Sequence, residues 1–189
     1  LPGMLNAEAL LELGQHAQSA AAALAALSTL PADPGFDNST WPPVKYQLSI
    51  LPLLAISAAH SGARERALEY TKRLEDTSIP FFGSALNKPI KSNSLARAYM
   101  AIGDYAKALD NLGSSGLWRI VVGLADVTSP MAYQGQGDTL STQTELPRLL
   151  MLSKALAETG KRDDAKTSLD GLLNASRLKD AGDLYWLAL

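Results

Sequence analysis

The strongest constraint on this chain is a glycine that recurs at a fixed distance from a leucine and an alanine. Gly62, Gly103 and Gly160 each have a leucine eight residues before them and an alanine five residues after them. Glycine readily adopts the left-handed backbone that ends many helices, and a small side chain lets two helices pack closely. The spacing therefore predicts antiparallel helix hairpins, each with its turn at the glycine.

The clearest predicted hairpin surrounds Gly103, with Asp104 placed to cap its second helix. A weaker version surrounds Gly14, which lies before the alanine-rich segment Ala20–Ala26. The first helix of the Gly103 hairpin has an apolar face at helical spacing, made of Leu95, Ala98, Tyr99 and Ile102. The second has a stripe made of Tyr105, Ala108, Leu109 and Leu112.

The composition favours helices throughout the chain. Alanine and leucine together supply 62 of the 189 residues, and both are strong helix formers. Residues with β-branched side chains are sparse, and no segment alternates between apolar and polar residues as a half-buried strand does. The predicted fold class is therefore all-α.

Charge and cysteine content argue against several classes of function. The net charge is −2, so the chain lacks the basic excess that binding a phosphate backbone requires. It has no cysteine and only two histidines, which excludes disulfides, thiolate metal sites and a cysteine nucleophile. We expect no cofactor and no nucleic-acid partner. No apolar run reaches the roughly 18 residues of a membrane helix, so no membrane insertion is expected, and the cytoplasm is the default compartment.

The hairpins resemble tetratricopeptide repeats. That family places small residues, an aromatic or leucine, a glycine and an alanine at set positions of a helix pair. Around Gly62, Thr71 departs from the family's last position; the family's first-helix Trp and closing Pro are absent. The matching residues are Ala55, Ala58, Gly62 and Ala67; Ala96, Tyr99, Gly103, Ala108 and Leu112; and Ser153, Leu156, Gly160, Ala165 and Leu169. The resemblance implies a right-handed superhelical solenoid.

The spacing of the glycines predicts irregular insertions in this solenoid. Gly62 and Gly103 are 41 residues apart and Gly103 and Gly160 are 57 apart, whereas the family's period is about 34 residues. Between the first two, 77–91 is expected to be an extra segment broken by Pro80 and Pro89. The predicted division is an alanine-rich helix over 1–30, a proline-rich break over 31–43, repeats near 44–77, 90–113 and 145–176, a partial repeat over 179–189, and an insertion over 114–144.

The last residues indicate how the chain continues. Asp183–Leu189 holds Leu184, Tyr185 and Trp186 in a helix-like segment, although a terminal repeat normally presents a polar outer face. We therefore expect a fragment of a larger, bacterial-type protein. The string resembles the helix before caspase-like (CHAT) peptidase domains, which implies a regulatory repeat region as an alternative function.

The candidates for chemistry each have a plainer structural interpretation. His60 and His16 are possible bases or ligands, but each is interpreted as a partly exposed residue because no other His or Cys stands nearby in the sequence. The pair Asp163–Asp164 is explained by its place at a helix N-terminus. The Gly135–Gly137 stretch lacks the other residues of a phosphate loop.

The aromatic residues and the glycosylation patterns add little to the prediction of function. Trp41, Trp118 and Tyr133 are interpreted as packing residues of the inserted segments, with a contact patch as the alternative. The sequons at Asn38 and Asn174 occur commonly by chance.

The expected function is protein–protein interaction, as a scaffold or sensor segment. The resemblance implies a concave groove, lined by first helices, that takes a protein or peptide partner or the remainder of its own chain. Arg97, Asn93 and Lys154 are the groups expected to hold a carboxylate or peptide backbone. The second alternative is a stand-alone all-α enzyme that uses the polar loop over 131–142. The predicted groove residues are Asn93, Arg97, Met100, Leu150, Lys154, Glu158, Ile56 and His60.

Overall fold

The computed structural model describes residues 2–30, 41–77, 83–112 and 150–174. Within these ranges the chain forms eight helices and no strand, which confirms the all-α prediction. The helices are α1 (Pro2–Glu12), α2 (His16–Ser28), α3 (Trp41–His60), α4 (Arg64–Asp76), α5 (Gly83–Ile102), α6 (Tyr105–Leu112), a helix over 150–158 and α9 (Arg162–Asn174).

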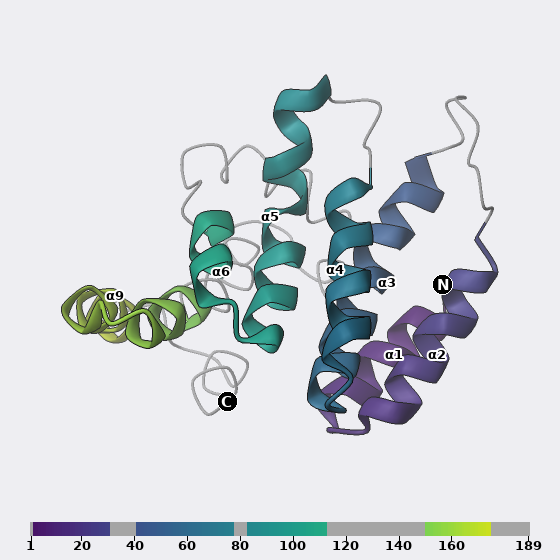
Figure 1. Ribbon diagram of the computed structural model, residues 1–189, viewed down its shortest axis with the longest axis horizontal. Coiled ribbons are helices and arrows are strands. Elements are labelled where there is room, and N and C mark those ends of the chain that lie inside the picture. The colour runs from purple at the N-terminus through teal and green to yellow at the C-terminus, as the bar shows by residue number, and fades with distance from the viewer. Residues whose placement is uncertain (1, 31–40, 78–82, 113–149, 175–189) are drawn as a thin grey trace.

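The helices pack as pairs that follow one another along the chain. Helix α1 packs on α2, α3 on α4 and α5 on α6. Figure 1 shows the order across the molecule, from α1 and α2 at one end, through α3 and α4, to α5 and α6. Helix α3 lies at the centre of this arrangement, because it contacts α1, α2, α4 and α5.

Four turns between paired helices have the same backbone geometry. Gly14, Gly62, Gly103 and Gly160 have φ angles of 71°, 77°, 81° and 85°. At each turn the N–H of the following residue donates to the carbonyl five residues earlier, as Asp104 N does to Tyr99 O at 2.9 Å. This is the bond of a Schellman motif, which ends a helix with a left-handed residue. The glycine turns predicted from the spacing are therefore present.

The residues after each glycine also follow one pattern. The carbonyl of the residue after the glycine accepts from the N–H four residues later, as Asp104 O does from Ala108 N at 3.0 Å. Asp104 also accepts from Lys107 N through its side chain, so its predicted capping role is confirmed. Ala67 and Ala108 are fully buried five residues after their glycines, where a larger side chain would separate the paired helices.

The core is made largely of leucine and alanine from these pairs. Leu53 and Leu54 of α3 pack with Met4 and Ala7 of α1. Leu48 and Leu51, also from α3, pack instead with side chains of α4, α5 and α6 and with Ala155 of the helix over 150–158. The apolar residues of α3 therefore join the earlier and later helix pairs into one body.

Three features differ from the sequence prediction. The region 1–30 contains two helices rather than one, because Gly14 makes a turn like the other three. Helix α3 begins at Trp41, inside the predicted break 31–43. Helix α5 includes Pro89, which was expected to break the chain. A proline within a helix removes one backbone hydrogen bond, and in α3 the buried Pro52 shows that core packing can outweigh this loss.

We predict that Gly103→Ala destabilises the protein by roughly 1–2 kcal/mol, because an L-residue with a side chain is strained at a φ of 81°. A Cβ at this position would meet nothing within 4 Å, so the cost comes from the backbone and not from a collision. The expected fall in melting temperature is several degrees, measured by circular dichroism.

Gly103→Asn is the matched control for this measurement. Asparagine tolerates the left-handed conformation better than alanine, so its loss should be smaller. Equal losses for alanine and asparagine would contradict the backbone explanation.

Candidate functional site

An ion pair connects two of the first helices of the hairpins. Arg97 on α5 donates from Nη1 and Nη2 to Oε1 of Glu8 on α1, at 3.4 Å in each case. The two residues are 89 positions apart in sequence. Helices α1 and α5 each pack against α3, so the pair spans the helix between them. The predicted groove residue Arg97 therefore already binds a carboxylate of its own chain.

His60 meets the chain's other histidine at the end of α3. Its ring stacks on that of His16, the first residue of α2, with 4.7 Å between ring centroids and 12° between ring planes. Burial, then His16, then Lys154 of the helix over 150–158 lower the pKa of His60. His60 is also an exposed residue at a helix end, as predicted.

The other predicted groove residues fall into two groups. Met100 and Ile56 are partly buried and pack against core residues. Leu150 is partly buried, whereas Lys154 and Glu158 are exposed. Asn93 is one helical turn before Arg97, and its Oδ1 is buried with no hydrogen-bond partner in the described part of the chain. Two of these predicted residues thus interact with a residue of another first helix: Arg97 with Glu8, and His60 with Lys154. The contacts of the described residues do not bring the other predicted groove residues together.

A second polar cluster lies where α4 ends against α5. Lys91 donates from Nζ to the backbone oxygens of Glu75 and Thr77, which are among the carbonyls that the end of α4 leaves free. Burial lowers the pKa of Lys91. The hydroxyl of Tyr99 donates to Glu75 Oε1, and burial followed by this bond raises the pKa of Tyr99. This cluster holds α5 on α4 and explains two polar groups within the core.

Buried hydroxyl groups join the first three helices. Ser19 on α2 donates to the carbonyl of Ala7 on α1 at 2.7 Å, and Ser57 on α3 donates to Ser19 at 3.1 Å. Ser19 stands five residues after Gly14, where the other hairpins have alanine. Thr71, which departs from the repeat pattern, is buried and donates to the carbonyl of Ala67. These hydrogen bonds let Ser19 and Thr71 occupy buried positions where the repeat pattern has apolar residues.

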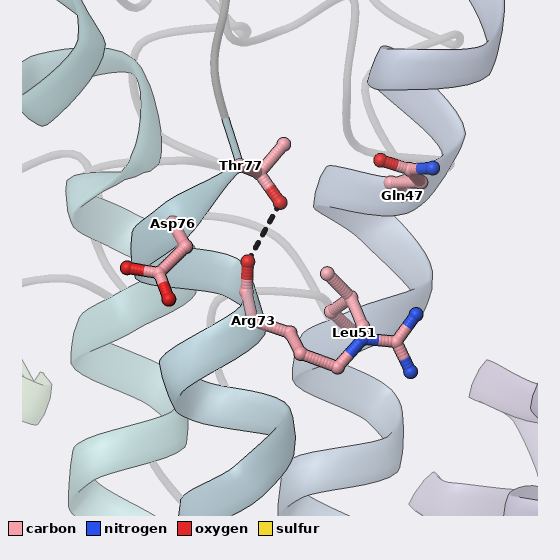
Figure 2. Close-up of a pocket in the computed structure, with 5 residues that line it drawn as sticks. All are labelled: Gln47, Leu51, Arg73, Asp76 and Thr77. Atoms are coloured by element: carbon pink, nitrogen blue, oxygen red, sulfur yellow. Dashed lines mark hydrogen bonds between the residues drawn. The ribbon is translucent and has the colours of Figure 1, made fainter. Parts of the chain in front are cut away.

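A shallow pocket lies between α3 and the end of α4. Figure 2 shows Arg73 extending beside Leu51 toward α3, while Asp76 points away from them. Thr77 donates to the carbonyl of Arg73, and Asp76 accepts from Lys72. The polar groups around this pocket do not converge on one point, so the pocket offers no arrangement for acid–base or nucleophilic chemistry. Its lining residues are Gln47, Leu51, Arg73, Asp76 and Thr77.

Several sequence candidates lie outside the described residues. They include Trp118, Tyr133, Gly135, Asn38, the loop over 131–142 and the segment over 179–189. Within the described ranges, no group of three or more His, Asp or Glu side chains is arranged to hold a metal ion. None of the helices in those ranges has both the length and the apolar character needed to cross a membrane.

The chain was compared with family models, curated proteins and solved structures, and it matches none of them.

We predict that Glu8 and Arg97 stabilise each other by roughly 1 kcal/mol, at the upper end of the range for exposed pairs. The reason is partial burial, since their side chains are 15% and 31% exposed. The measurement is a double-mutant cycle of Glu8→Gln, Arg97→Gln and the double variant, followed by chemical denaturation. Additive losses in the cycle would show that the ion pair contributes nothing.

Proposed function

We propose that this chain is a tetratricopeptide-like solenoid that binds a protein or peptide partner on the side formed by its first helices. Two features support a repeated architecture. The four glycine turns share one hydrogen-bond pattern, and α1, α3 and α5 contact one another in chain order. Stacked hairpins of this kind bury a continuous core and present one face of successive helices to a partner.

The observation that carries the proposal is the meeting of polar side chains from successive hairpins. Glu8, Arg97, His60 and Lys154 come from four different first helices. Glu8 binds Arg97 across α3, and the charge of Lys154 acts on His60. Both contacts link first helices of different hairpins, and these are the helices that would face a partner.

These groups suit the chemistry of a peptide. The guanidinium of Arg97 presents several donors in one plane, which match a carboxylate or two backbone carbonyls. Met100 and Ile56 offer apolar contact on the first helices, because both are only partly buried. A partner with acidic or backbone groups would compete with Glu8 for Arg97.

The proposal predicts that peptides selected on this protein bind through Arg97. The probe is a phage library of random 12-residue peptides panned against the folded chain, with affinities of enriched peptides measured by calorimetry. Arg97→Gln and Lys154→Gln should each weaken binding about tenfold or more, because a charge-assisted hydrogen bond contributes about 1.5–3 kcal/mol.

Two controls separate binding from folding. Arg66→Gln removes an exposed cation from α4, away from the first helices, and should leave affinity unchanged. The exchange Glu8→Arg with Arg97→Glu keeps an ion pair in reversed orientation, so it should restore stability but not binding. Enriched peptides that bind all these variants equally well would refute the proposed groove.

A further inference from the structure

The contact between His16 and His60 gives the first two hairpins a feature that the peptide-binding proposal does not use. His16 begins α2 and His60 ends α3, so their stacked rings lie where the α1–α2 hairpin meets α3. Histidine is the one side chain whose ordinary pKa, about 6.5, lies between pH 5 and 8. The chain has only these two histidines. Its histidine titration is therefore concentrated at a single contact.

The geometry disfavours a positive charge on both rings at once. Planar rings that face each other with centroids 4.7 Å apart pack well when at most one of them is charged. Adding a proton to each ring would place two like charges face to face, and like charges at this separation oppose the second protonation.

The nitrogen of His16 adds a second constraint. Its Nδ1 is buried and has no hydrogen-bond partner within the described residues. Loosening this contact would open the atom to water, which can satisfy its hydrogen-bonding capacity.

The charged groups around the contact do not compensate a positive charge on His60. Lys154 lies near enough for its ammonium to lower the pKa of His60, in the same direction as burial and His16. No carboxylate of the described residues contributes to the pKa shift of His60. Charged side chains on the helices that pack against α3 have interactions of their own: Glu8 on α1 accepts from Arg97, Arg64 on α4 donates to the carbonyl of Ile102, and Glu12 at the end of α1 also has an interaction.

We propose that His16 and His60 form a pH-sensitive clasp, which holds the α1–α2 hairpin against the end of α3 when the rings are neutral and loosens it when both are protonated. The clasp is independent of the proposed peptide groove, since it concerns the packing of the chain itself. It would make the exposure of the first hairpin depend on the acidity of the surroundings.

The direction of the pH effect follows from the lowered pKa of His60 in the folded protein. Between that lowered value and the ordinary value of about 6.5, the unfolded chain binds more protons than the folded one. Stability from the clasp is therefore complete above about pH 6.5 and is lost as the pH falls through this window.

The first test is an NMR titration of the unmodified chain, because its two imidazole rings give only two sets of resonances. The midpoint of His60 should lie below 6.5, and Lys154→Gln should raise it by removing a nearby positive charge. An ordinary or raised midpoint for His60 would overturn the proposal.

The second test measures the loosening itself by amide hydrogen exchange at pH 7.5 and 5.0. After correction for intrinsic exchange rates, protection of α2 amides should fall about tenfold or more relative to that of α4 amides. In His60→Phe, which keeps a flat ring but cannot take up a proton, the ratio should stay constant. Should that variant fail to fold, His16→Phe serves the same purpose.

An equal change in α2 and α4 protection, or the same fall in the phenylalanine variant, would show that acid acts elsewhere and would refute the clasp. Peptide binding can be measured on the same samples at pH 7.5, where the clasp is closed. A failure of either proposal is thus seen separately from the other.

Discussion

The left-handed glycine turn is the constraint on which the rest of this structure depends. At Gly14, Gly62, Gly103 and Gly160 the chain ends one helix and begins the next within a few residues, using the same backbone hydrogen bonds each time. A turn this short forces consecutive helices to lie against each other. The residue that faces the neighbouring helix then has to be small, and Ala67 and Ala108 are buried at that position. The pairing of helices thus follows from backbone geometry before any long-range contact forms.

Sequence analysis could predict those parts of the fold that depend on residues close together in the sequence. Gly103, Asp104 and Ala108 belong to one local motif, and their roles follow from capping and turn chemistry. The turn at Gly14 was predicted only as a weaker version; its hairpin has Ser19 where the others have alanine, and the hydrogen bond from Ser19 to Ala7 shows why a hydroxyl is tolerated there. Pro89 was misjudged because a local rule about proline carries no information on the packing of a long helix.

The candidate site was less predictable, since its defining contacts join residues that have no fixed spacing. Arg97 was placed among the groove residues by the resemblance to tetratricopeptide repeats. Finding Glu8 as its partner required knowing how α1 and α5 sit on either side of α3. The same holds for His60, whose ring partner His16 is 44 positions earlier in the chain. Lys91 shows the point most simply, because its role is to satisfy backbone carbonyls of another helix.

The pair between Glu8 and Arg97 has a consequence for the order in which the chain folds. Hairpins closed by glycine turns need only local contacts, and such contacts form quickly because little loop entropy is lost. A contact between residues 89 positions apart can form only once α3 has gathered its neighbours on both sides. The ion pair is therefore a late event in assembly. It adds a bond between the first and third helix pairs to the contacts between neighbouring pairs, so that fraying of the N-terminal pair weakens the packing of α5.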